Sequence, residues 1–152
     1  MGASEYVVGT DTLQAGPGDE MGMDYERQGT EFLRRFAFRL VVRFVDSRCP
    51  PWEDRRDHIH GDHYRVTVRR GRKSLSFDYW NSYQDRAAGK SPTSCDILAC
   101  LSSNISAPTD PDEVAQEFGE MKPSQAIAIA KFARRLQRFF TPEEQEALME
   151  IR

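Results

Sequence analysis

The sequence lacks the features that mark membrane and secreted proteins. No apolar run approaches the roughly 20 residues of a membrane span, and no apolar signal core follows the first methionine. The three cysteines, Cys49, Cys95 and Cys100, are odd in number and none forms a CxxC pair. A disulfide framework needs a dense, even set. We therefore expect reduced, mostly buried thiols and a cytoplasmic protein that makes no membrane contact.

Length and charge exclude further classes. A chain of 152 residues is too short for full dinucleotide-binding oxidoreductases, TIM barrels or protein kinases. The net charge of −3 gives no overall excess of basic residues. However, residues 1–31 hold seven acidic residues and one arginine, whereas residues 32–75 hold twelve basic and five acidic residues. The basic middle predicts a positive face; the alternative is that the acidic segment neutralises it.

The pattern of glycine and charge predicts a domain boundary near residue 30. Residues 1–29 are rich in glycine and acids and show little periodicity. They predict a flexible acidic leader, because such a segment buries too little apolar area to offset its ordering entropy. Only Glu5–Gly9 has the composition of a short edge strand. Residues 30–152 are predicted to form one domain.

Alternation of apolar and polar residues predicts a sheet in the middle of the chain. A period of two from Phe36 to Phe44 predicts a half-buried strand over about 36–45, with a helix as the competing interpretation. Residues 53–62 are predicted to be a loop. Two alternating runs then flank Arg70-Gly71-Arg72, which predicts a β-hairpin. Their inward-facing members are Tyr64, Val66, Val68, Leu75, Phe77 and Tyr79.

The second half of the sequence predicts helices. They cover Ser94–Leu101, a segment from Asp110 to about Phe118, Ser124–Phe140, and a last helix that Thr141-Pro142 begins. The predicted fold class is α+β. It consists of a small antiparallel sheet of about three strands, with a central basic hairpin, packed against a C-terminal group of three to four helices.

One histidine motif resembles a known metal-binding signature. His58-Ile59-His60-Gly61-Asp62-His63 has the HxHxDH spacing of metallo-β-lactamase-fold hydrolases, whose metals activate water. That fold needs further histidines and a longer chain, and all three histidines of this sequence are already in the motif. We therefore predict no metal and no cofactor. A simple zinc or nickel site completed by Cys49 or Asp57 is the alternative.

The hairpin carries the predicted binding site. Its tip is strongly basic, and aromatic residues follow it, so it could contact a phosphate backbone or an acidic protein surface. The alternative is that a hairpin tip is charged because it is exposed. No Gly-rich phosphate loop, GxSxG motif or carboxylate pair indicates catalysis, so no enzyme is predicted. The candidate partner-binding residues are Arg65, Arg69, Arg70, Arg72, Lys73, Trp80 and Tyr83.

Several blocks in order resemble a family of small proteins encoded by phages, prophages and other mobile elements. They are the strand-opening His63-Tyr64 with the basic hairpin, the helix from Pro92-Thr93, the acidic helix that ends Glu117-Phe118-Gly119, and the basic helix with the tail Leu136–Phe140. The resemblance covers more than half of the chain. It implies a mobile-element context rather than a chemistry.

From that context we predict a non-enzymatic, phage-encoded protein that inhibits a host defence complex, as anti-CRISPR proteins do. Its partner would be a host protein or ribonucleoprotein complex, bound through the basic hairpin. The alternative is a nucleic-acid-binding accessory protein of phage replication or gene control. A metal-dependent enzyme that uses His58, His60 and His63 is a third, weaker hypothesis.

Overall fold

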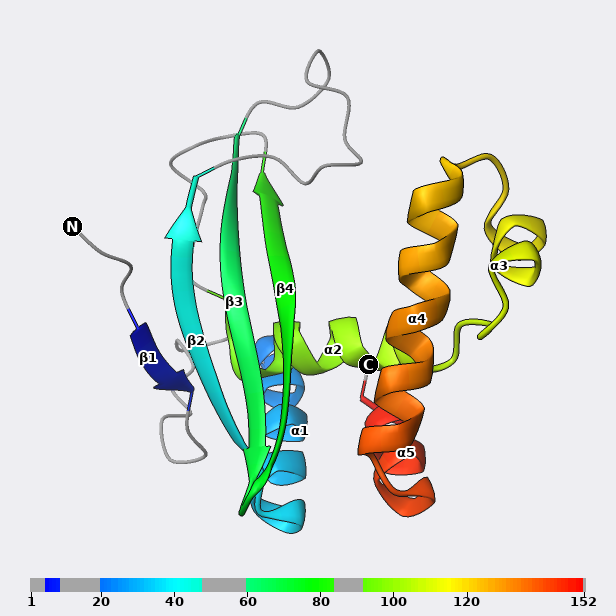
Figure 1. Cartoon of the computed structure of the whole chain (residues 1–152). Coiled ribbons are helices and arrows are strands. Elements are labelled where there is room, and N and C mark those ends of the chain that lie inside the picture. Colours follow the sequence, from blue (N-terminus) through cyan, green and yellow to red (C-terminus); the bar gives the residue numbers. More distant parts are fainter. Residues whose placement is uncertain (1–4, 9–19, 48–59, 84–91, 152) are drawn as a thin grey trace. The chain divides into compact units, whose positions relative to one another are not determined.

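Two compact units make up the chain, Met1–Ser94 and Cys95–Arg152. The computed structural model describes residues 5–8, 20–47, 60–83 and 92–151. The first unit holds a sheet and one helix, and the second is helical (Figure 1). The α+β class predicted from the sequence is confirmed. The contacts place residues 30–152 in two units, where the sequence predicted one domain.

The first unit is built on a four-stranded antiparallel sheet. Its strands are β1 (Glu5–Val8), β2 (Arg39–Asp46), β3 (His60–Arg70) and β4 (Lys73–Tyr83), in the spatial order β1-β2-β3-β4. β1 pairs with β2, so that Val8 lies opposite Leu40. The short edge strand expected within residues 5–9 is therefore present, over Glu5–Val8. It raises the strand number from about three to four.

The predicted hairpin is confirmed. β3 and β4 pair from His60 opposite Tyr83 to Arg70 opposite Lys73. Two residues connect them, and the first, Gly71, has φ 59°. A two-residue loop of type II′ places glycine at this position, because other residues rarely adopt a positive φ. β3 begins at His60, so the predicted loop over residues 53–62 ends earlier than expected.

The strand predicted over residues 36–45 is wrong at its start. Phe36 is the last residue of helix α1 (Glu20–Phe36), and β2 begins at Arg39. Between them, Ala37 N–H donates to Arg34 O (3.3 Å) and Phe38 N–H donates to Leu33 O (2.9 Å). This is a Schellman motif with Ala37 in the left-handed position, at φ 59°. The alternating phenylalanines therefore cross a helix end that no glycine marks.

Helix α1 also begins inside the predicted leader. The boundary placed between residues 29 and 30 falls within this helix, which starts at Glu20. Glycine lowers helix propensity by about 1 kcal/mol per residue, and Gly22 and Gly29 both lie in α1. Because of these two glycines, the sequence did not predict a helix here. Residues 9–19 of the predicted leader lie outside the described residues.

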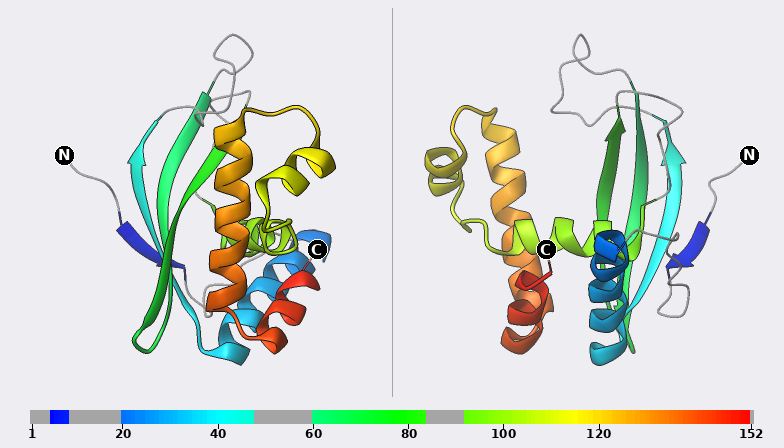
Figure 2. Two further views of the ribbon diagram at one scale, coloured as in Figure 1. Left: turned by 45° about the vertical axis from the view of Figure 1, so that its right-hand side comes forward. Right: turned by 180° about the vertical axis from the view of Figure 1, so that it is seen from behind.

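Alternation along the strands separates a covered face of the sheet from an open face. The side chains of one parity are buried, among them Leu40, Val42, Val66, Val68, Leu75 and Phe77. Helix α1 lies alongside the sheet (Figures 1 and 2). Its Phe32 stacks on Phe38, which has the parity of Leu40, with ring centroids 5.8 Å apart. α1 therefore covers the apolar face and leaves the other face open.

The second unit contains four helices, in the order predicted. They are α2 (Ser94–Ile105), α3 (Pro111–Phe118), α4 (Pro123–Phe139) and α5 (Pro142–Met149). Asp110 caps α3 by accepting a hydrogen bond from Asp112 N (3.1 Å), and Thr141 and Glu144 form a capping box on α5. Pro111 and Pro142 occupy the first helical position, where a missing N–H costs nothing.

Side-chain hydrogen bonds connect the helices of the second unit. Gln137 Nε2 on α4 donates to Ile105 O at the end of α2 (3.0 Å), and Gln145 Nε2 on α5 donates to Phe140 O (2.8 Å). Cys95 is a buried free thiol and Cys100 a partly buried one, as expected; Cys49 lies outside the described residues. None of the described helices is long and apolar enough to cross a membrane.

Candidate functional site

Arginines from two strands meet on the open face of the sheet. Arg39 of β2 lies opposite Arg69 of β3, and Arg43 lies opposite Arg65. Arg39, Arg43 and Arg69 are exposed, and Arg65 is partly exposed. We call these four residues the four-arginine face. It is the largest set of like charges that the sheet register brings together among the described strands.

Hydroxyl groups lie among these arginines. Thr67 is opposite Val41 on one side and opposite Ser76 on the other, midway between the two arginine pairs. The Thr67 and Ser76 hydroxyl oxygens are 2.8 Å apart and hydrogen-bonded. Ser74 lies opposite Arg69 and is exposed. Guanidinium and hydroxyl groups are the donors that proteins use most often on phosphate oxygens.

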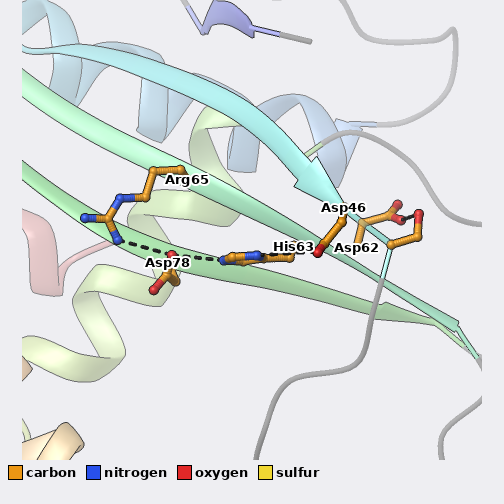
Figure 3. Close-up of polar contacts among 6 residues, drawn as sticks. Asp46, Asp62, His63, Arg65 and Asp78 are labelled. Atoms are coloured by element: carbon orange, nitrogen blue, oxygen red, sulfur yellow. Dashed lines mark hydrogen bonds and ion pairs between the residues drawn. The ribbon is translucent and has the colours of Figure 1, made fainter. Parts of the chain in front are cut away.

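A line of polar side chains continues the open face away from the hairpin tip (Figure 3). Arg65 donates to Asp78 Oδ1 (3.1 Å), and the same oxygen is 2.9 Å from His63 Nε2. His63 Nδ1 is 3.6 Å from Asp46 Oδ1. The line crosses β4, β3 and β2, so it ties three strands together. Asp62 accepts a hydrogen bond from Ser47 Oγ (2.9 Å) beside it.

Asp78 is the charged centre of this line. Burial alone would raise the pKa of its carboxyl, but hydrogen bonds from His63 and Arg65 and the charge of Arg65 lower it more, so that the net pKa falls below its ordinary value. An ionised carboxylate only accepts hydrogen bonds. His63 therefore donates from Nε2. The arrangement holds the far end of the hairpin in register and orients the ring of His63.

Trp80 completes this end of the face. Its ring stacks on the His63 ring, with centroids 4.0 Å apart and an angle of 12° between the ring planes. His63 is only 6% exposed, so Trp80 helps to cover it. Tyr83 ends β4 opposite His60, and its side chain lies outside the described residues. Of the two predicted aromatic residues, the structure places Trp80 on the open face.

The predicted site is spread over the length of the hairpin rather than gathered in one patch. Lys73 and Trp80 are seven residues apart on β4, which separates them by about 23 Å at about 3.3 Å per residue. Arg72 and Lys73 are exposed at the tip. Arg70 lies over the Phe38 ring, with its guanidinium carbon 4.8 Å from the centroid, so it also contacts the covered side. Of the seven predicted binding residues, only Arg65 and Arg69 belong to the four-arginine face.

Arg39 and Arg43 were not among the predicted binding residues. Their strand, β2, is an internal strand between β1 and β3. Their alternation with apolar residues showed that they share a face. Their position opposite Arg69 and Arg65 depends on pairings between residues 30 and 22 positions apart in the sequence, which no local pattern contains.

The histidine cluster is only partly described. His58 lies outside the described residues, as does the side chain of His60. Both ring nitrogens of His63 are directed at carboxylates, Nε2 at Asp78 and Nδ1 at Asp46. Within the described part of the chain, no group of three or more histidine, cysteine or acidic side chains could hold a metal ion. The geometry of His63 is that of a structural hydrogen-bonding residue.

Comparison with known proteins adds no relative. No family model, no curated protein and no solved structure matches this chain. The resemblance to mobile-element proteins therefore stays a prediction.

Proposed function

We propose that this chain is a non-enzymatic binding protein whose four-arginine face holds the phosphate backbone of a nucleic acid. The observation that carries the proposal is the pairing of Arg39 with Arg69 and of Arg43 with Arg65. Like charges directly opposite each other on one face of a sheet are destabilising. The Arg39–Arg69 pair has this arrangement, whereas in the second pair Arg43 also lies opposite Glu5 of β1 and Arg65 donates to Asp78. Local conflicts of this kind are expected at functional sites, and a bound polyanion would relieve this one.

The shape and chemistry of the face support a nucleic acid over an acidic protein surface. Arg39 and Arg43 are four residues apart, about 13 Å along the strand at about 3.3 Å per residue. That length is about four times the rise of about 3.4 Å per phosphate along the axis of a B-DNA strand. The hydroxyls of Thr67 and Ser76 lie between the two arginine pairs. An open sheet face with an aromatic residue at one end also resembles the platforms on which single strands bind.

The test exploits the register. In the variant Arg39→Glu/Arg43→Glu, each new carboxylate lies opposite an arginine, Arg69 or Arg65, but residue 43 also lies opposite Glu5 of β1. These gains and losses oppose each other, so we expect the free energy of unfolding to stay within about 0.5 kcal/mol of its original value. Binding should weaken about a hundredfold, because each charge-assisted hydrogen bond contributes about 1.5 kcal/mol and 1.4 kcal/mol is tenfold. Urea unfolding and fluorescence anisotropy with a labelled single strand measure the two effects.

The matched control is Arg39→Lys/Arg43→Lys, which keeps the charge and should retain most of the affinity. Undiminished binding by the glutamate variant would overturn the proposed interface. If the unaltered protein binds neither single-stranded nor duplex nucleic acid at low salt, the proposed function is wrong. The stoichiometric inhibitor of a host defence complex is then the hypothesis to test, through a nuclease-resistant protein partner.

A further inference from the structure

A second basic surface lies in the helical unit, on α4. This helix of 17 residues contains no acidic residue. Its four cations, Lys131, Arg134, Arg135 and Arg138, are all exposed. They follow one another at the spacing i, i+3, i+4, i+7, which puts them on a single side of a helix. We call these four residues the basic face of α4.

The basic face concentrates like charges on one side of the helix, although Arg138, in the last turn, is favoured by the helix dipole. Like charges three and four positions apart on a helix repel each other, and Lys131 has such neighbours in Arg134 and Arg135. The opposite side of α4 is buried within the unit: Ala126 and Ala130 pack with Val114 of α3. The basic face is therefore the side that α4 presents outward from this core.

We propose that the basic face of α4 is a second phosphate-backbone contact, so that a nucleic acid of sufficient length engages both compact units at once. The inference rests on the proposed function of the four-arginine face and deepens it. From Lys131 to Arg138 the helix rises about 10.5 Å at about 1.5 Å per residue. This length is about three times the rise of about 3.4 Å per phosphate along the axis of a B-DNA strand.

The same face could in principle lie on an anionic membrane, but the packing of α4 argues against it. Helices that lie in a membrane interface bury their apolar side among the lipid tails. In α4 that side is already occupied, since Ala130, Ala133 and Leu136 are fully buried, and Ile127 is the one large apolar side chain of this helix that is exposed. A phosphate backbone needs only the cations. The structure therefore favours nucleic acid as the occupant.

Two contacts on one ligand have a measurable consequence. Once one unit is bound, the second contact becomes intramolecular, and the affinity rises steeply when the ligand becomes long enough to reach it. An oligonucleotide too short to engage both faces gains nothing from α4. The affinity of the full chain should therefore increase with length more steeply than the number of binding registers alone requires.

The experiment compares two variants of the full chain on short and long single strands. The helix-face variant is Lys131→Glu/Arg134→Glu/Arg138→Glu, and its control is Lys131→Arg/Arg134→Lys/Arg138→Lys. Arg135 is left unchanged because it has a further interaction in the described structure. Glutamate has a helix propensity close to that of arginine and lysine, so the helical circular dichroism should be unchanged.

We expect the helix-face variant to bind a short strand normally. On a long strand it should lose at least about tenfold in affinity, and the slope of log affinity against log salt should flatten by about 2, because three phosphate contacts contribute about 0.7 each. The control should behave like the unaltered chain. An unchanged affinity and slope on the long strand would overturn the inference, as would an equal loss on both lengths.

These experiments distinguish a failure of the proposed function from a failure of the inference about α4. If Arg39→Glu/Arg43→Glu loses affinity while the helix-face variant does not, the four-arginine face stands and the second contact is wrong. If the unaltered chain binds neither length, both are wrong.

Discussion

At the scale of single residues, Ala37 is the position where the backbone is most strained. It has φ 59°, and it is the one non-glycine residue with positive φ among those described. The left-handed backbone conformation costs a residue with a Cβ about 1–2 kcal/mol, and glycine avoids this cost. Part of the gain is lost, because a glycine makes the unfolded chain more flexible. We expect Ala37→Gly to raise the free energy of unfolding by about 0.5–1 kcal/mol, measured by urea denaturation.

A second alanine provides the control for this prediction. Ala128 is exposed in the interior of α4. There the substitution to glycine should lower stability by about 1 kcal/mol. Opposite signs for the two alanine-to-glycine changes are expected, and a destabilising Ala37→Gly would contradict the Schellman geometry of α1.

Cys100 shows how burial controls reactivity at this scale. Desolvation raises the pKa of its thiol to about 11, although the hydrogen bond from Asn104 to Sγ opposes the shift. The thiolate is the reactive form, so Cys100 stays in its unreactive form near neutral pH. Nothing in its setting supports a redox or nucleophilic role.

At the scale of elements, Asp78 couples the hairpin to pH. A carboxyl whose pKa is lower in the folded than in the unfolded chain stabilises the fold above its unfolded pKa of about 3.9, and this contribution is lost as the pH falls through the folded value. We expect Asp78→Asn to lower the urea midpoint at neutral pH and to reduce the further loss between about pH 5 and pH 3. Unfolding followed at several pH values measures both.

Asp78→Glu is the control, because it retains a carboxylate and should retain more of the acid sensitivity than the asparagine variant does. The same acid sensitivity in Asp78→Asn as in the unaltered chain would show that His63 and Arg65 do not act through this carboxylate. The outcome bears on the site, because Asp78 fixes the position of Arg65 on the four-arginine face.

Elements with local signals were predictable from the sequence, and those defined by distant pairings were not. Gly71 marks the hairpin turn, and proline with a capping residue marks the start of α3 and of α5. The end of α1 has no such mark, because alanine occupies the position that glycine usually takes. The hairpin arginines were predictable as a group because they flank the glycine that marks the turn. Their position opposite Arg39 and Arg43 was not predictable, because it depends on the register of β2 on β3.

At the scale of the whole molecule, a chain of net charge −3 is proposed to bind a polyanion. The two facts are compatible because charges act over a limited distance in salt. The screening length is about 10 Å at 0.1 M salt and about 30 Å at 0.01 M. A phosphate on the four-arginine face therefore interacts mainly with those arginines at physiological salt. At low salt it also interacts with the acidic residues elsewhere in the chain.

This difference predicts a curved salt dependence. The plot of log affinity against log salt should be steep between about 0.1 and 0.3 M and should flatten toward about 0.01 M, since repulsion by distant acids then offsets part of the attraction. Glu31→Gln removes an exposed acid of the same unit and should straighten the low-salt end. Anisotropy titrations over this range measure it. A straight line down to the lowest salt, unaltered in the variant, would mean that binding does not respond to the charge of the whole chain.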